Sequence, residues 1–229
     1  MAVEWIERWE TGNTPWHRDK VADSLVKYID QLTDGNKQAR MLIPLCSKSL
    51  EMKWLVDQGY DVVGVELAEL AAKQFLKEHN ITFTTHRRND DVIIYEAVDV
   101  KLRIVISDIL SCTSEMCGGA VDAIWDMNAL VAIPMDNWSK YIDVCVSLLK
   151  PRKRILLSTS VYNESERGTK PVRPYNVPSE KVQRLYGDKF DVHHLEDVDF
   201  LYFAHDKFLD EGWTPTKFHQ SINLLVAKN

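Results

Sequence analysis

The segment from Arg40 to Glu66 constrains the fold of this chain more than any other part of it. It contains an apolar run that ends in Ile-Pro-Leu-Cys, a helical stretch, and a second apolar run, Val-Val-Gly-Val, that ends on Glu66. A buried strand, a tight loop, a helix and a second buried strand form the first crossover of a nucleotide-binding α/β sheet. An acid about 20 residues past such a loop can accept hydrogen bonds from both hydroxyls of a ribose, so we expect Glu66 to bind one.

The loop between the first strand and its helix, residues 45–48, contains no glycine. Loops that bind pyrophosphate use glycine because backbone N–H groups must come close to the charged oxygens. The loop therefore argues against NAD and FAD and favours a less anionic nucleoside. S-adenosylmethionine meets that requirement, and its product would be S-adenosylhomocysteine.

Length and charge favour one domain and a small-molecule partner. The 229 residues are 45% hydrophobic, and no repeat or Pro/Gly/Ser linker divides them. With 28 Lys and Arg against 34 Asp and Glu, the net charge of −6 gives no basic field for nucleic acid or an anionic membrane. The N-terminus has no apolar signal or transmembrane run, and the four cysteines lack CxxC or Cys/His metal spacing. We therefore expect a cytoplasmic protein without a metal.

Apolar periodicity predicts alternating helices and strands. Helical spacing marks residues 21–32, 50–58, 67–79, 136–149 and 178–186. Strands are predicted from residue 40 to the Pro-Leu-Cys loop and at 61–66, 102–107, 120–126, 154–160, 192–203 and 219–227, the last two without a clear helix between them. A run at 92–97 forms a hairpin with 102–107, of which the second arm enters the sheet. The pattern predicts a Rossmann-like α/β fold: a mostly parallel seven-stranded sheet with an antiparallel edge strand and helices on both faces.

Two segments of this single domain, 1–229, are expected to cover the ligand. Residues 1–35 should form a helical segment over the cofactor. Residues 162–178 include three prolines, one glycine and several charges. A loop of this length in a compact domain is usually a lid or a binding loop.

The carboxyl ends of parallel strands line the ligand crevice in such sheets, so residues that follow each strand are site candidates. Glu66 would bind the ribose there, or serve only as an acid that interacts with the dipole of the next helix. Asp108, after Ser107, could accept the adenine amine or cap a turn. Asp126 and His17 are catalytic candidates that could take a proton from the acceptor, although His17 could instead make a structural hydrogen bond.

Three tryptophans, Trp5, Trp9 and Trp16, lie within twelve positions ahead of the first strand. Trp5 and Trp9, at i and i+4, can bury one helical turn against the sheet. The same rings could form an aromatic wall over the cofactor, where their faces attract a sulfonium by cation–π contact worth about 0.5–2 kcal/mol. The pattern leaves both interpretations open.

These residues and several short motifs together resemble the thiopurine S-methyltransferase family. The motifs are Trp5-x3-Trp9-x2-Gly12-x-Thr14-x-Trp16-His17, Ile43-Pro-Leu-Cys-x-Lys48, Met52-Lys-Trp54, Val62-Val-Gly-Val-Glu66 and Ile124-Trp-Asp126-x2-Ala-Leu-Val-Ala-Ile133. The resemblance runs in register from about Trp5 to Leu149, and its Pro-Leu-Cys loop is specific to that family. It implies a class I methyltransferase that moves the methyl group of S-adenosylmethionine, by in-line transfer, onto a small thiol, thione or related soft sulfur or selenium acceptor.

The resemblance also implies site residues position by position. The family's cofactor-binding positions are matched by Trp5, Trp9, Thr14, Trp16, Leu45, Glu66, Ser107, Asp108 and Met127, of which Trp16 and Met127 are also placed to touch the acceptor. Met127 stands where the family has an arginine, and Ser47 where it has a glycine. Because methionine offers an apolar surface instead of a cationic bidentate donor, we expect an acceptor other than a thiopurine. Restoring arginine at Met127 should raise thiopurine turnover.

Two other functions remain open. One is a small-molecule methyltransferase with an oxygen, nitrogen or halide acceptor, and the other is a degenerate family member that only binds S-adenosylmethionine or its product. The resemblance favours a monomer, and we expect neither nucleic acid nor membrane as a partner.

Overall fold

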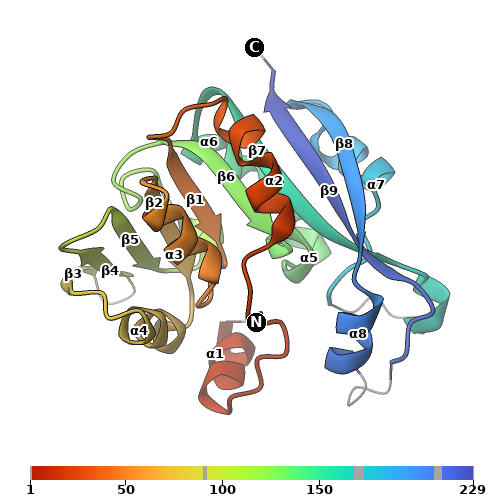
Figure 1. Cartoon of the computed structure of the whole chain (residues 1–229), viewed down its shortest axis with the longest axis horizontal. Helices are drawn as coiled ribbons and strands as arrows, with labels where there is room; N and C mark the ends of the chain where they lie inside the picture. Colours follow the sequence, from red (N-terminus) through yellow and green to blue (C-terminus); the bar gives the residue numbers. More distant parts are fainter. Residues whose placement is uncertain (1, 90–91, 168–172, 209–212, 229) are drawn as a thin grey trace.

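Nine strands among the described residues form one continuous twisted sheet (Figure 1). The structure is a computed structural model that describes residues 2–89, 92–167, 173–208 and 213–228. The strand order is β3-β4-β5-β2-β1-β6-β7-β9-β8. The strands are β1 Arg40–Pro44, β2 Asp61–Glu66, β3 Phe83–Asn89, β4 Val92–Ala97, β5 Leu102–Ile106, β6 Val121–Met127, β7 Leu149–Tyr162, β8 Phe190–Asp199 and β9 Phe218–Ala227.

The five central strands, from β5 to β7 in this order, run parallel. Arg40 of β1 pairs with Asp61 of β2, and Glu66 of β2 pairs with Ile106 of β5. Two antiparallel strands flank this core on each side, β4 and β3 at one end and β9 and β8 at the other. The carboxyl ends of the parallel strands therefore meet at one edge, where sheets of this kind bind ligands.

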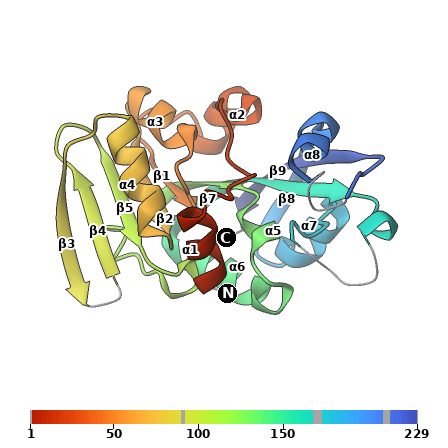
Figure 2. The same cartoon turned by 90° about the horizontal axis from the view of Figure 1, so that it is seen from below.

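Helices cover both faces of the sheet. They are α1 Ala2–Glu10, α2 Asp23–Thr33, α3 Leu50–Asp57, α4 Glu69–Glu78, α5 Ala129–Ala132, α6 Trp138–Leu148, α7 Ser179–Tyr186 and α8 Leu201–Phe208, with 3-10 turns at 109–111, 135–137 and 164–167. Buried residues of α2, α3 and α4 pack on one face and those of α5, α6 and α7 on the other. Figure 2 shows α2 and α3 across the sheet from α6 and α7. None of the described helices has the length and apolar character needed to span a bilayer.

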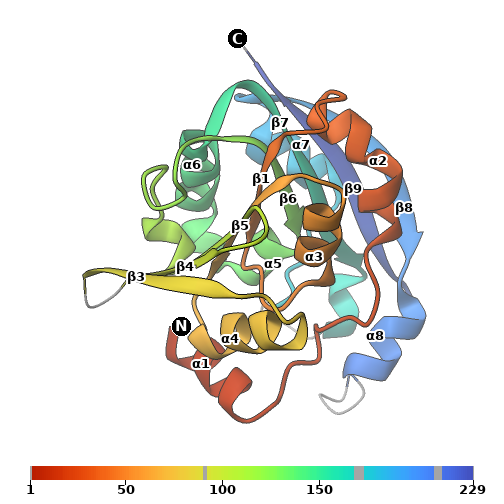
Figure 3. The same cartoon turned by 60° about the vertical axis from the view of Figure 1, so that its left-hand side comes forward.

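The predicted fold class is confirmed, but the predicted strand count is wrong. The sequence predicts seven strands with one antiparallel edge strand, whereas the sheet has nine strands and an antiparallel pair on each side. The β4 run, predicted only as a hairpin arm, pairs with β5 inside the sheet. β3 lies at the edge of the sheet (Figure 3), and each of its residues 83–88 is exposed. Its side chains after Phe83 are polar, so the strand lacks the apolar alternation that marks a half-buried strand.

The end of the chain also differs from its prediction. The sequence predicts a strand over residues 192–203 that leads directly to the last strand, but β8 ends at Asp199 and α8 follows it. The apolar run Phe-Leu-Tyr-Phe-Ala at 200–204 reads as strand because a short apolar run has no clear period. In the fold it packs against Trp213 and Phe218, which stabilise it as a helix.

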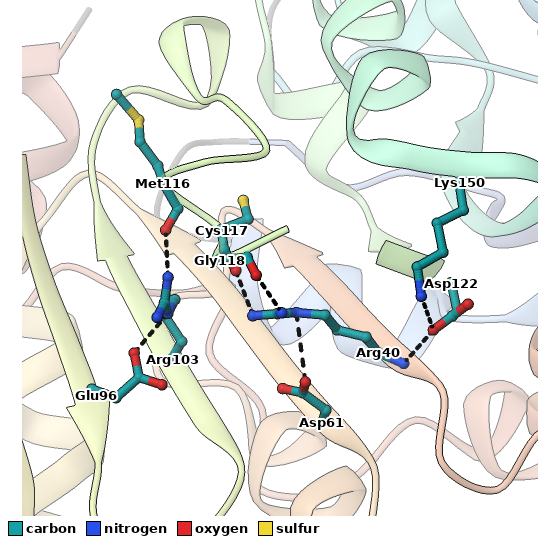
Figure 4. A network of polar contacts seen from close by, with 9 residues as sticks. All are labelled: Arg40, Asp61, Glu96, Arg103, Met116, Cys117, Gly118, Asp122 and Lys150. Atoms are coloured by element: carbon teal, nitrogen blue, oxygen red, sulfur yellow. Dashed lines mark hydrogen bonds and ion pairs between the residues drawn. The ribbon is translucent and has the colours of Figure 1, made fainter. Parts of the chain in front are cut away.

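Arg40 ties the amino end of β1 to the loop that precedes β6 (Figure 4). Its guanidinium donates to the carbonyl oxygens of residues 117 and 118 at 2.5 and 2.8 Å and lies 3.6 Å from the Asp61 carboxylate. Its backbone N–H donates to Asp122 at 3.0 Å. This network holds the amino edge of the sheet, opposite the edge at which the parallel strands end.

Candidate active site

A cavity of about 1160 Å³ opens at the carboxyl edge of the parallel strands. It exceeds the roughly 300–1,000 Å³ of ordinary small-molecule pockets, so it has room for more than one small molecule. The predicted site residues that line it are Trp5, Trp9, Trp16, His17, Leu45, Glu66, Ser107, Asp108 and Met127. Thr14 and Asp126, also predicted, do not line it.

Glu66 ends β2 with its carboxylate buried in the cavity wall. Its Oε1 accepts from the backbone N–H groups of Leu67 and Ala68, both at 2.8 Å, and its Oε2 accepts from the Ser47 N–H at 2.8 Å. Burial raises the pKa of this carboxyl, against the effect of the three donors. A carboxylate offers about four acceptor positions, so one on Oε2 remains for a donor in the cavity. The predicted interaction of Glu66 with the start of the next helix is therefore present, and the carboxylate can still accept a hydrogen bond from a ligand.

The loop after β1 turns tightly although it has no glycine. Leu45 and Ser47 have φ angles of 49° and 55°, in the left-handed region that glycine usually occupies. The Cys46 N–H donates to β2 at 3.0 Å, and the Ser49 N–H donates to the Cys46 carbonyl at 3.0 Å. This conformation points the Ser47 N–H at Glu66, so the loop and the end of β2 form one unit.

Gly64 of β2 makes room for that loop. A Cβ at this position would lie 2.6 Å from the Cys46 sulfur and 2.9 Å from the Met52 sulfur. Both side chains are buried. Packing beneath the loop therefore requires a glycine in Val-Val-Gly-Val. Leu45 and Glu66, in contrast, line the cavity.

The residues after β5 lie beside Glu66. The Ser107 N–H donates to the Glu66 carbonyl oxygen at 2.9 Å. Asp108 is exposed, and its Oδ1 accepts from the Leu110 N–H at 2.9 Å, which caps the turn at 109–111. The capping role that the sequence allows is thus present, and Oδ2 leaves acceptor positions for a ligand.

The three N-terminal tryptophans pack edge to face beside the cavity. The Trp16 ring centroid lies 5.1 Å from that of Trp5 and 6.2 Å from that of Trp9. Trp9 is 5% exposed and packs on Ala68 and Ala71 at the start of α4. Trp9 therefore anchors α1 on the domain, while all three rings also line the cavity.

Asp126 lies behind the cavity wall. Its Oδ1 accepts from the N–H groups of Ala129 and Leu130 at 2.8 and 3.3 Å, and its Oδ2 accepts from the Tyr141 hydroxyl at 2.7 Å. The side chain is buried, and this burial raises its pKa to about 6. These contacts hold α5 and α6 on β6, and the carboxylate is not among the groups that line the cavity.

His17 and Thr14 belong to the same short segment but differ in position. His17 lines the cavity, and burial together with the Lys48 charge lowers the pKa of its imidazole. The ring is therefore neutral near pH 7 and has a nitrogen that can accept a proton. Thr14 forms a turn, in which its carbonyl oxygen accepts from the His17 N–H at 3.0 Å.

The site residues predicted one by one did not include a further group of aromatic residues and arginines in the cavity wall. This group contains Arg18, Arg167 and Arg173, which lie in the predicted cover and lid segments, and Phe200, Phe203, Trp213 and Phe218 near the end of the chain. The aromatic-rich stretch at 200–218 is visible in the sequence, but its position depends on β9 turning back along β7. Of the predicted lid loop, residues 166–167 and 173–175 line the cavity, and residues 168–172 lie outside the described residues.

In the part of the chain that the structure describes, no three His, Cys, Asp or Glu side chains gather to hold a metal ion.

Comparison with solved structures supports the fold. The N-methyltransferase NodS from Bradyrhizobium japonicum WM9, in complex with S-adenosyl-L-homocysteine, has a TM-score of 0.65 at 12% identity and covers 100% of this chain and 99% of its own. The 1,6-didemethyltoxoflavin-N1-methyltransferase of Burkholderia thailandensis has a TM-score of 0.63 at 12% identity, and the match covers 100% of this chain and 87% of that protein. Identities this low show the shared fold alone.

Comparison of sequences is more specific. A model of the family Thiopurine S-methyltransferase (TPMT) matches residues 1–224. The thiopurine S-methyltransferase of Legionella pneumophila (strain Corby) is 40% identical over 182 residues, 80% of this chain and 79% of that protein. A probable thiopurine S-methyltransferase of Danio rerio is 32% identical over 228 residues, which are 98% of this chain and 94% of that protein. The chain therefore belongs to the thiopurine S-methyltransferase family and is an S-adenosylmethionine-dependent methyltransferase.

Proposed function

We propose that this methyltransferase transfers the methyl group of S-adenosylmethionine to the sulfur of a small thiol or thione. The observation that carries the proposal is the position of Asp126, whose carboxylate accepts three internal hydrogen bonds and is not among the residues that line the cavity. An alcohol acceptor would need a strong base to remove its proton. A thiol is already partly ionised near neutral pH, and a thione needs no base. The relatives named above as thiopurine S-methyltransferases agree with this acceptor class.

We assign the cofactor half of the cavity to Glu66, Leu45, Ser107 and Asp108. Glu66 keeps one acceptor position on Oε2 for a ribose hydroxyl, and the exposed Asp108 can accept from the adenine amine. The tryptophan rings beside them can attract a positively charged sulfur through their faces. These residues fit S-adenosylmethionine, which supplies, when bound, a methyl group on such a sulfur.

The remaining residues act by orientation. In-line transfer needs the acceptor sulfur held opposite the bond that breaks, and a cavity that binds both molecules and excludes water lowers the entropic barrier. Trp16, which packs on Trp5 and Trp9, and Met127, which lies beside Arg18, both line the cavity and can contact the acceptor. His17, neutral near pH 7, can accept the proton of an acceptor that arrives as an uncharged thiol.

The N-terminal segment and the loop after β7 meet across the cavity, which supports their proposed roles as cover and lid. Arg173 donates to Glu4 at 2.5 Å, and its guanidinium lies 4.9 Å from the Trp5 ring centroid. We propose that the described parts of the two predicted segments, residues 2–35 and residues 162–167 and 173–178, close together over the ligands. Limited proteolysis with and without S-adenosylhomocysteine should show protection of both segments together, and protection of neither would contradict this role.

We further propose one domain that acts as a monomer in a reducing compartment such as the cytoplasm. All four cysteines are free and buried. Light scattering coupled to size-exclusion chromatography measures the oligomeric state directly, and a dimer mass would overturn the monomer.

Incubation with methyl-labelled S-adenosylmethionine tests the reaction. The acceptor panel should contain thiols, selenols and thiopurines together with matched alcohols and amines. We expect label on at least one sulfur or selenium acceptor. Label only on oxygen or nitrogen would contradict the proposed acceptor class, and tight calorimetric binding of S-adenosylhomocysteine without any turnover would indicate a binding module.

A further inference from the structure

Arg18 places a positive charge in the cavity wall next to uncharged neighbours. It comes from the segment between α1 and α2, is half-buried, and lines the cavity. Its Nη1 lies 3.7 Å from the Met127 sulfur, and its guanidinium carbon lies 5.0 Å from the centroid of the Phe200 ring. Neither a thioether nor a phenyl ring neutralises the guanidinium.

The acids nearest to Arg18 in the chain do not pair with it. Among the described residues, no carboxylate lies within the 4.0 Å of a salt bridge. Glu51 accepts a backbone N–H at the start of α2 at 2.9 Å, Asp23 pairs with Lys20, and Asp19 is exposed. Burial is the main influence on the pKa of Arg18 and lowers it, yet a guanidinium remains charged at neutral pH. A partly desolvated cation without a counter-charge is unfavourable, and an anionic ligand would compensate it.

Acids that line the same cavity have other partners. Glu4 accepts from Arg173 at 2.5 Å, and Glu166 accepts a backbone N–H of the segment before β9 at 2.9 Å. Arg167 stacks 4.0 Å over the Trp213 ring and adds another guanidinium to this wall. The cavity wall at Arg18 therefore combines an aromatic ring with a guanidinium that has no carboxylate partner among the described residues.

We propose that Arg18 binds a carboxylate carried by the sulfur acceptor, so that the acceptor is an aromatic thiol or thione with an acidic substituent. The inference rests on the proposed sulfur-methyltransferase function and narrows its substrate class. A guanidinium can hold a carboxylate through two parallel N–H bonds. The Phe200 ring beside it can pack on an aromatic ring of the same molecule, and Met127 adds apolar surface.

Kinetics with a matched pair of thiols test this inference. para-Mercaptobenzoate and para-methylbenzenethiol share a ring and a thiol, and only the first carries a carboxylate. The measured quantity is the ratio of kcat/KM for the acidic thiol to kcat/KM for the neutral one, so that differences in intrinsic thiol reactivity cancel between variants. We expect this ratio to fall about tenfold or more in Arg18→Gln, because a charge-assisted bidentate contact is lost. Arg18→Lys keeps the charge without the planar fork and should lose less.

Arg184→Gln is the matched control. Arg184 lies on the exposed side of α7, so its substitution removes the same charge away from the cavity and should leave the ratio as in the wild type. An unchanged ratio in an Arg18→Gln protein that binds S-adenosylhomocysteine normally would overturn the inference. If the glutamine variant does not fold, the same ratio is measured for Arg18→Lys, and an unchanged ratio in that variant would likewise overturn the inference.

A binding measurement separates this inference from the proposed function. para-Mercaptobenzoate is titrated by calorimetry into protein loaded with S-adenosylhomocysteine, for the wild type and Arg18→Gln. Weaker binding in the variant supports the role of Arg18 even if no thiol is ever methylated, in which case only the proposed function fails. Equal affinity, or no binding in either protein, overturns the inference.

Discussion

The Nη1 atom of Arg18 lies 3.7 Å from the sulfur of Met127, although 109 positions separate the two residues in the chain. Met127 occupies the position where the resemblance to the family implies an arginine, and its neighbour in space is itself an arginine. The cavity therefore holds one guanidinium at this point, supplied by the segment before α2 and not by the end of β6.

Restoring arginine at Met127 should consequently require a second change. Two like charges about 4 Å apart repel by about 4 kcal/mol at an effective dielectric constant of about 20, less whatever side-chain rotation relieves. We expect Met127→Arg to lower the melting temperature, and Met127→Arg combined with Arg18→Gln to recover most of the loss. Thiopurine turnover should rise more in the double variant than in the single one. Thermal unfolding and labelled-methyl assays measure both, and additive effects of the two substitutions would contradict the coupling.

Glu66 should carry much of the affinity for the cofactor. Its remaining acceptor position faces a cavity, and a hydrogen bond to a charged group contributes about 1.5–3 kcal/mol. We expect Glu66→Ala to weaken S-adenosylhomocysteine binding by about ten- to a hundredfold in calorimetry. The variant should also unfold at lower temperature because three backbone N–H groups lose their acceptor. Glu180→Ala, on the exposed side of α7, is the control for loss of a charge. Unchanged affinity in a folded Glu66→Ala protein would refute the assignment.

Asp126 should make stability depend on pH in a defined direction. Burial raises its pKa in the folded protein from 3.8 to about 6, so the folded state holds this proton more tightly than the unfolded chain does. The resulting stabilisation is complete below about pH 4 and is lost as the pH rises through about 6, a change on the order of 3 kcal/mol. The free energy of unfolding of the wild type, relative to the non-titrating Asp126→Asn, should fall by this amount across that range. Urea unfolding at a series of pH values measures it.

The same variant tests the catalytic candidacy of Asp126. If this carboxylate took a proton in the reaction, kcat of Asp126→Asn would fall by orders of magnitude at a temperature where the protein is folded. Its three internal donors and its position outside the cavity lead us to expect a loss confined to stability.

Gly64 should tolerate no side chain while Cys46 is present. A Cβ would lie 2.6 Å from the Cys46 sulfur in a fully packed core, and overpacking of this kind typically costs about 1–3 kcal/mol. We expect Gly64→Ala to lower the free energy of unfolding by that amount. Adding Cys46→Ala should relieve part of the clash, since it removes the nearer sulfur while the Met52 sulfur at 2.9 Å remains. A double-mutant cycle in urea measures the coupling, and strictly additive losses would show that the two sites do not meet.

The strand, loop, helix and strand that end at Glu66 could be predicted because each element depends on neighbours in the sequence. Their apolar runs, the Ser49 cap and the spacing to Glu66 are local features, and the structure places them as expected. β3 could not be predicted, because an exposed edge strand needs no apolar alternation. The helical form of α8 could not be predicted either, because its short apolar run is stabilised by packing against Trp213 and Phe218.

By itself, the sequence determined the sheet type and the family resemblance, and it predicted residues for the cofactor half; all of these follow from short-range patterns. Only the tertiary structure decided that Asp126 faces away from the cavity and that Arg18 meets Met127 and Phe200. The physical reason is that a side chain's partners, burial and charge environment depend on how distant elements cross. Those crossings are set by the packing of the whole chain, and no local periodicity encodes them.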